Sequence, residues 1–507
     1  MLTSNRSVSP SHRRAMTATI LLAAVLRVAL FLWSWHQSPD LATLHSPDTA
    51  AYVLPARSLL ESGSFSVNGQ PEIFHTPGYP LLLVPGLALG NVELVTFLIQ
   101  LILSLATVVL VARMALEMFG DPRAAIAAAA LMAVEPLSII YTSALLTETL
   151  FTFLFVVALY ALLRYFATNR ANWLTLCGLC LAAATFVRPV SYYLPAALVV
   201  GLLVRAVWLG SFCRRASHCL RFVVACFIPL VAWQVRNDRL ADYPGFSASG
   251  DFNLYFHHAA WTVAQRTGQT LEAVQRQFGG ARGEQFNVVH PELAGASRAT
   301  RYAFMRRTGK QIVAADLPAW SRAELRNISM IALNPGGTSF LQLASHSPPP
   351  RPHRLASEGV LATIGRMARE TPALFATSLV LGTTLGVTYL VAILGWIAGL
   401  RRRPWEMLAL AGVVAYLTVV SAGVVEARMR HPVMPALCLL GGAGAALSLR
   451  FAAAACASCA AAFARPAVLQ WRVSSPDGAI DAGPQSSPEW TARESNVGEE
   501  RDDPAYR

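Results

Sequence analysis

The 507-residue sequence contains little charge: Asp, Glu, Lys and Arg make up only 14% of it, whereas 54% of its residues are hydrophobic. Its mean hydropathy is +0.44. So large an apolar excess excludes a soluble protein of this size. It predicts a polytopic α-helical membrane protein, because each crossing of a hydrocarbon core of roughly 30 Å needs about 20 apolar residues.

Lysine is almost absent, since Lys310 is the sole lysine and the other basic residues are arginine. The formal net charge of +12 would suggest a nucleic-acid partner for a soluble protein. Here much of it falls in short loops between apolar runs, where arginine indicates membrane orientation. We therefore predict contact with membrane lipids and no nucleic-acid partner.

Cysteine is also scarce, and none of the eight cysteines lies in either of the two long polar segments. Two CxxC pairs occur, one beginning at Cys177 and one at Cys456, but a zinc site normally needs four ligands with polar flanks. They are interpreted as small residues that pack within the membrane. Walker and Rossmann glycine patterns are missing, so the sequence requires no cofactor, although a divalent metal ion stays an alternative.

The apolar runs predict about 10–12 transmembrane helices. Basic residues ahead of the first run place residues 1–16 in the cytoplasm, and arginines between later runs agree with that orientation. The predicted domains are a transmembrane module (17–235) with a first external loop (37–77), an external segment (236–371), C-terminal helices (372–464) and a disordered cytoplasmic tail (465–507).

Individual segments carry more specific expectations. A short interfacial helix is predicted over 49–62, ended by Gly63. The proline-rich stretch 76–90 and the run 94–111 are interpreted as one broken crossing of the membrane, with two separate crossings as the alternative. A further span is predicted over 124–140. The external segment is expected to form a helical cap over 261–278 and 297–331 with an extended linker at 345–354. Whether 451–464 extends the last helix stays open.

Polar residues map mostly to the outer ends of these helices. Acids and arginines at membrane depth are costly unless they are paired or face water, so they are functional candidates. They are Asp48, Glu135, Glu148, Arg188, Arg236, Asn237, Glu426, Arg428, Arg430 and His431. The structural alternatives are helix capping for Asp48 and Glu148, bundle hydrogen bonding for Glu135, and anchoring at the interface for Arg188, Arg428 and Arg430.

This set of residues suits one kind of chemistry. A carboxylate at the outer surface can act as general base on an acceptor hydroxyl. Nearby arginines can hold a phosphate and stabilise it as it leaves. The pattern indicates group transfer from a lipid phosphate carrier to an acceptor on the far side of the membrane.

The order of motifs from "PDTAAYVLPARSLLESG" through "HTPGYPLLL", "YTSALLTETLF", "LAAATFVRP" and "WQVRND" to "EARMRHPVMPAL" resembles the GT-C glycosyltransferases. The resemblance is to their bacterial aminoarabinose-transferase and protein-mannosyltransferase-like members and covers about residues 17–449. It implies a GT-C fold in the bacterial inner membrane and a polyprenyl-phosphate sugar donor. It also implies a lipid, glycan or protein acceptor and an extracytoplasmic active site.

The resemblance also implies roles for residues. Asp48 would be the catalytic base of an inverting transfer, with Glu148 as a second catalytic carboxylate. Arg188, Arg428 and Arg430 would bind the donor phosphate. Support of the acceptor, sugar or loop is assigned to Tyr52, His75, Tyr79, Glu135, Arg236, Asn237 and His431. Many relatives carry two adjacent acids in the first loop, whereas Thr49 follows Asp48 here.

Two other classes remain. An envelope polysaccharide ligase or polymerase would use arginines and a histidine of an outer loop, and "RMRHP" fits that pattern. A lipid flippase or transporter would predict inverted repeats and helices broken near mid-membrane, and the sequence shows no such internal symmetry.

Overall fold

The computed structural model describes residues 9–210, 212–280, 283–344 and 360–463. The predicted linker at 345–354 and the predicted tail at 465–507 lie outside these residues. Residues 1–453 form one compact unit, and a second unit begins at Ala454. Within the described residues the chain is all-α apart from one two-stranded antiparallel hairpin, as predicted.

The helices up to the outer segment are α1 (Pro10–Gln37), η1 (Ala42–Leu44), α2 (Thr49–Ser62), α3 (Gly78–Ala88), α4 (Val92–Phe119), α5 (Pro122–Ala133), α6 (Pro136–Ser143), α7 (Glu148–Thr168), α8 (Ala171–Val187), η2 (Pro189–Ser191), α9 (Leu194–Trp208) and α10 (Phe212–Ala241). The hairpin between α2 and α3 consists of β1 (Ser66–Val67) and β2 (Gln70–Pro71).

The outer segment contains α11 (Ser249–Asn253), the π-helical turn η3 (Leu254–Ala259), α12 (Ala260–Thr267), α13 (Leu271–Phe278), α14 (Phe286–Val289), η4 (Pro291–Leu293), α15 (Arg298–Ala315), α16 (Leu317–Leu333), α17 (Gly337–Ala344) and α19 (Val360–Glu370). The chain then forms α20 (Pro372–Leu400), α21 (Pro404–Val420), the 3-10 segment η5 (Ala427–Val433) and α22 (Met434–Phe463).

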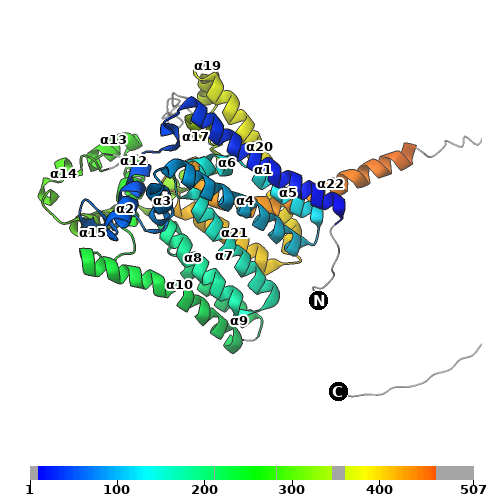
Figure 1. Cartoon of the computed structure of the whole chain (residues 1–507), viewed down its shortest axis with the longest axis horizontal. Helices are drawn as coiled ribbons and strands as arrows, with labels where there is room; N and C mark the ends of the chain where they lie inside the picture. Colours follow the sequence, from blue (N-terminus) through cyan, green and yellow to red (C-terminus); the bar gives the residue numbers. More distant parts are fainter. Residues whose placement is uncertain (1–8, 211, 281–282, 345–359, 464–507) are drawn as a thin grey trace, which may run out of the picture. The chain divides into compact units, whose positions relative to one another are not determined.

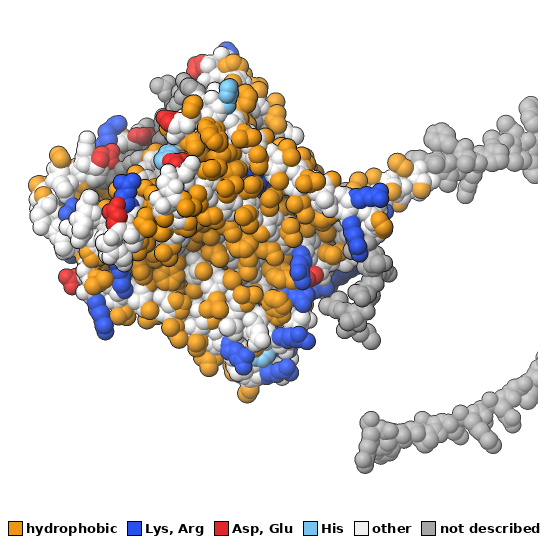
Figure 2. Space-filling model, viewed as in Figure 1, with side chains coloured by type: hydrophobic (Ala, Val, Ile, Leu, Met, Phe, Trp, Pro, Cys, Tyr) orange, Lys and Arg blue, Asp and Glu red, His pale blue; other side chains and the backbone are white. Residues whose placement is uncertain are grey.

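Seven of the described helical segments are long and apolar enough to cross a membrane, and the bent pair α5–α6 adds an eighth. The shorter apolar helices α3, α8 and α21 come in addition, so the predicted range of 10–12 is reached only with these included. Figure 2 shows hydrophobic side chains covering the middle of one face, with basic side chains toward its margins. The chain is an integral, multi-pass membrane protein.

The core of the first unit lies between α7, α8 and α10, with α4 packed against α5 and α7 (Figure 1). In the segment predicted to be external, α12 and α16 pack on each other, and α15 packs on η3. The short helix α2 has the predicted bounds and packs against α3. Gly63 ends it in the left-handed region, with φ +68°, which glycine adopts without steric cost.

The predicted span over 124–140 is bent in the structure, because α5 and α6 meet at an angle of 52°. Pro136 begins α6, and Glu135 before it is extended, with ψ 117°, since a residue preceding proline avoids helical geometry. The Glu135 carboxylate then accepts a hydrogen bond from the Ser138 amide, 2.5 Å away, and caps α6.

The structure gives the helices of two stretches that the sequence left open. The stretch 76–111 forms two helices, α3 and α4, separated by Leu89–Asn91. Gly86 of α3 packs so closely on Val92 that a Cβ there would lie 2.8 Å from the Val92 Cα. Met434–Phe463 is one helix, so the stretch after Leu449 extends the last span.

Candidate active site

Asp48 stands directly before α2, and its carboxylate pairs with a residue from the far end of the chain. It holds the N-cap position, but its side chain makes no capping hydrogen bond. Instead its Oδ2 accepts a hydrogen bond from Arg428 Nη1 at 2.7 Å. The Asp48 side chain is 37% exposed, so this carboxylate is accessible from outside the bundle.

The loop that carries Asp48 is fastened to the turn between α6 and α7. The buried Thr49 hydroxyl donates to the Leu145 carbonyl at 3.2 Å, and the Leu145 amide donates to the Leu44 carbonyl at 3.1 Å. These contacts join a segment just after the first span to one at the start of α7. The position of Asp48 is therefore set by the packing of the helices.

Glu148 begins α7 and forms a second carboxylate–arginine pair. The carboxylate is 1% exposed, and its Oε1 accepts a hydrogen bond from Arg188 Nη1 at 2.7 Å. Arg188 lies between α8 and η2, and its side chain is also largely buried. A buried carboxylate is stabilised in its charged form by such a partner, which accounts for an acid at the end of an apolar helix.

The segment η5 connects the two pairs. Arg428 contacts Asp48, and its Nε also lies 2.6 Å from Oε2 of the half-exposed Glu426. The next residue, Met429, places its sulfur 3.4 Å from Arg188 Nη2. Two arginines and three carboxylates thus meet where α2, α7, α8 and η5 come together.

Tyr52 lies in the middle of this group. Its ring makes edge contacts with His75, at 4.9 Å between centroids, and with Tyr79, at 5.3 Å. Burial, and secondarily the charge of Glu148, raises the pKa of Tyr52 to about 12. The phenol therefore keeps its proton at neutral pH and can donate a hydrogen bond. Tyr79 of α3 is fully buried, and its hydroxyl donates a hydrogen bond to Gln100 of α4 at 3.3 Å, so it connects α3 to α4.

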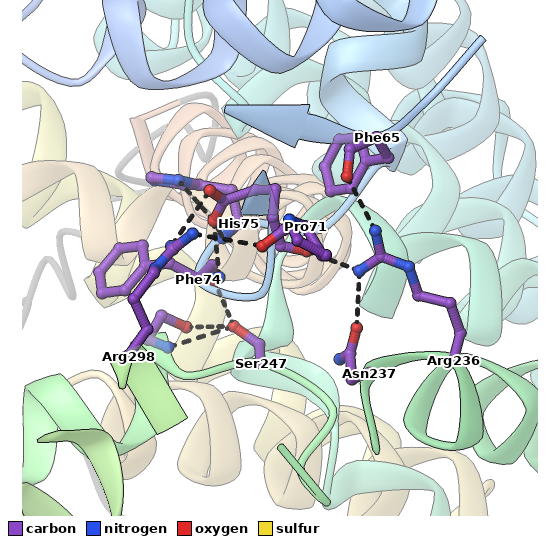
Figure 3. Close-up of polar contacts among 10 residues, drawn as sticks. Phe65, Pro71, Phe74, His75, Arg236, Asn237, Ser247 and Arg298 are labelled. Carbon is purple, nitrogen blue, oxygen red and sulfur yellow. Dashed lines mark hydrogen bonds and ion pairs between the residues drawn. The ribbon is translucent and has the colours of Figure 1, made fainter. Parts of the chain in front are cut away.

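His75 is held in place by Glu72; Figure 3 shows His75 beside Phe74 and Arg298. Glu72 Oε1 accepts hydrogen bonds from the amides of Phe74 (2.6 Å) and His75 (2.9 Å), and its Oε2 lies 3.2 Å from Arg298 of α15. Burial lowers the pKa of His75 below its ordinary value, against the opposing charges of Glu72 and Asp48. The imidazole is consequently neutral at pH 7 and lies within electrostatic reach of Asp48.

Arg236, near the end of α10, holds the same loop, and its neighbour Asn237 holds the segment that follows α10. Arg236 donates to the carbonyls of Glu72 (2.7 Å) and Phe65 (2.8 Å), and Figure 3 shows its bond to Phe65. Asn237 donates to the carbonyls of Gly245 (2.9 Å) and Phe246 (3.0 Å). These bonds go to backbone carbonyls, and Arg236 Nη1 also donates to Asn237 Oδ1 at 2.9 Å (Figure 3). Their contacts are those of loop supports.

Three other candidates do not join the Asp48 group. Glu135 caps α6. Arg430 is buried and donates to carbonyls at the end of α16, at 2.9 Å to Ile331. His431 is buried with its Nδ1 3.0 Å from the Thr152 hydroxyl. Consecutive residues of η5 therefore point to different neighbours, and only Arg428 reaches Asp48.

Sequence reasoning missed several residues. Glu72 and Arg298 fix the His75 loop, yet a single acid in a short loop gives no distinguishing pattern. Arg27 did give a signal, because an arginine inside the apolar run of α1 needs partners. It is fully buried and donates to Ser104, Ser138 and backbone carbonyls at the bend of α5.

Among the described residues, no group of three or more His, Cys, Asp or Glu side chains is arranged to hold a metal ion.

Part of this site lies in a segment that is similar to a known family. Residues 74–233 match the family model of the dolichyl-phosphate-mannose-protein mannosyltransferases. The match confirms, for that segment, the resemblance to GT-C membrane glycosyltransferases that the sequence motifs indicated. It includes Glu148 and Arg188 and leaves out Asp48 and Arg428. No curated protein matches the chain.

Similar solved structures include the archaeal oligosaccharyltransferase AglB from Archaeoglobus fulgidus, in complex with an inhibitory peptide and a dolichol-phosphate. It is 13% identical over 90% of this chain and 52% of its own, with a TM-score of 0.49. ArnT from Cupriavidus metallidurans bound to undecaprenyl phosphate is 18% identical over 83% of this chain and 77% of its own, with a TM-score of 0.35. The chain spans about half the length of AglB.

Proposed function

We propose that this protein transfers a sugar from a polyprenyl-phosphate-linked donor to an acceptor hydroxyl on the extracytoplasmic side of the membrane, with inversion at the anomeric carbon. The observation that carries the proposal is the pairing of the accessible Asp48 with Arg428 beside the buried Glu148–Arg188 pair. A base and two cations at one membrane surface are what transfer from a lipid phosphate requires.

The step follows from these groups. The acceptor hydroxyl gives its proton to the Asp48 carboxylate, and its oxygen forms a bond to the anomeric carbon. The bond between that carbon and the phosphate oxygen breaks, and its electron pair leaves on the phosphate. Arg428 and Arg188 stabilise that charge, while Glu148 keeps Arg188 in position.

Arg428 also regulates the base. Paired with Asp48 it favours the ionised carboxylate, which must be free of a proton before it can accept one. A donor phosphate that draws Arg428 toward itself weakens this pair and makes Asp48 more basic when the acceptor is in place. The same arginine would thereby couple donor binding to activation of the base.

The ligase alternative depends on an outer histidine. His431 is only 2% exposed and bonds to Thr152, which supports a packing role for it.

The test is transfer from radiolabelled polyprenyl-phosphate sugars in membranes, at matched expression. We expect Asp48→Asn to lower the rate by roughly 10²–10⁴-fold, the usual contribution of a general base. Asp40→Asn, which changes an exposed acid in the same loop, should keep wild-type activity. Undiminished transfer by Asp48→Asn would remove this residue as the base, and loss of transfer in His431→Gln alone would favour the ligase.

A further inference from the structure

A cluster of cations lies at the other end of the helices from Asp48, at the turn between α9 and α10. We call it the Arg205 cluster; it contains Arg205, Arg214, Arg215, His218 and Arg221. Helix α10 has 30 residues and therefore extends for about 45 Å. Its last turns hold the His75 loop through Arg236, so its first turns lie at the opposite membrane face.

Arg205 distinguishes this cluster from arginines that merely lie in a short loop. Its side chain is 8% exposed, and neither Nε nor Nη1 has a hydrogen-bond partner. Its remaining polar contact is a long one, 3.4 Å from Nη2 to the Phe166 carbonyl. The guanidinium stacks on the Phe166 ring at 4.6 Å, a contact that orients it but accepts no hydrogen bond.

Two neighbouring residues also have buried nitrogen atoms without a hydrogen-bond partner. Arg215 Nε and His218 Nδ1 are also buried without a partner. Arg214 and Arg221 are exposed, and the charges of Arg214, Arg215 and Arg221 bear on His218. The carboxylate that bears on Arg205 is Glu406, and it already pairs with Arg403 at 3.3 Å. Buried donors without acceptors, beside further cations, point to an anion that supplies the acceptors.

The surface beside the cluster is apolar. Trp208 is 78% exposed, Phe212 50% and Leu209 41%, and Trp208 makes an edge contact with Trp405. Figure 2 shows arginines gathered around a histidine at this margin, next to hydrophobic side chains. Tryptophan at such a boundary is typical of the headgroup region of a bilayer.

We propose that the Arg205 cluster binds the phosphate of an anionic phospholipid, whose acyl chains lie along Trp208, Leu209 and Phe212. A free phosphate would satisfy the same nitrogen atoms but would leave this apolar border exposed. The site is distinct from the Asp48 group and would anchor α9 and α10 at the opposite leaflet.

The experiment is native mass spectrometry of the purified full-length chain in detergent, with phosphatidylglycerol or phosphatidylcholine added. We expect one phosphatidylglycerol to be retained with an affinity at least about tenfold above that for phosphatidylcholine. Arg205→Gln should lower it about tenfold, the effect of losing hydrogen bonds from a charged donor. Arg123→Gln, an exposed arginine on α5, is the matched control and should leave it unchanged.

A second variant distinguishes loss of lipid binding from misfolding of Arg205→Gln. Arg214→Gln should fold normally because this side chain is exposed, and it should weaken phosphatidylglycerol binding about fivefold. Equal retention of the two lipids, or unchanged binding in both variants, would overturn the proposal. Displacement of the lipid by millimolar inorganic phosphate would also overturn it, because the cluster would then be a small-anion site.

Discussion

Replacing Arg27 by methionine should destabilise the protein although it removes a charge from the interior. Arg27 is fully buried in α1, and its guanidinium donates hydrogen bonds to the hydroxyls of Ser104 and Ser138, both at 2.8 Å. It also donates to the carbonyls of Ala23 and Ala133, at 3.0 Å, and of Met132, at 3.4 Å. The last two carbonyls end α5, where the bend deprives them of helical partners.

Two effects oppose each other in this variant. Removing a buried charge relieves its desolvation penalty, and apolar replacement of buried ionic groups is often neutral. Here, however, the acceptors remain buried. Loss of five hydrogen bonds at about 0.6 kcal/mol each, the average for side chains within membranes, gives about 3 kcal/mol. The unpaired carbonyls of α5 each add a penalty of the order of 1 kcal/mol, which offsets the relief.

The measurement is the free energy of unfolding in mixed detergent micelles for wild type, Arg27→Met and Arg113→Met. We expect a loss of about 3 kcal/mol for Arg27→Met. Arg113 has a 61% exposed side chain in an i,i+4 pair with Glu117, so its replacement should cost less than about 1 kcal/mol. An Arg27→Met protein as stable as wild type would show that the bend forms without these hydrogen bonds.

Two further predictions concern the outer side. Glu72→Gln loses the ion pair with Arg298 and weakens the hydrogen bonds to two amides, so sugar transfer should fall chiefly through a higher KM for donor or acceptor. The control is Glu93→Gln in the same region. An unchanged KM in Glu72→Gln would exclude a role for this loop in binding. Burial lowers the pKa of His257 to about 4, so the folded state binds fewer protons than the unfolded state between pH 6.5 and 4. Stability should accordingly fall as the pH drops through that window, and His257→Gln should flatten the dependence measured by thermal unfolding; equal slopes would refute the assignment.

The helices were predictable because their signals are local. Apolar runs of membrane length mark α1, α4 and α7 whatever surrounds them, and Gly63 ends α2 by its own backbone preference. The bend between α5 and α6 was predictable too, since Glu135 precedes a proline. It was missed because the apolar character continues across the break.

The pairing within the site could not be predicted in the same way. Asp48 and Arg428 are separated by 380 positions in the sequence. Their contact exists only because the loop after α1 and the segment before α22 meet near the start of α7. Sequence places each residue at the outer surface but gives no information on which acid meets which arginine. Glu148 and Arg188, 40 positions apart, present the same problem on a smaller scale.

The segment η5 shows why adjacent residues of one motif acquire different roles. A 3-10 turn advances about 120° per residue, so successive side chains leave it in different directions. Arg428 reaches Asp48, Met429 reaches Arg188, Arg430 reaches the end of α16 and His431 reaches Thr152. One short segment thus connects the external helices to both carboxylate–arginine pairs. A shift of α16 when an acceptor binds would move Arg430 and, through the same turn, the Arg428 that holds the base.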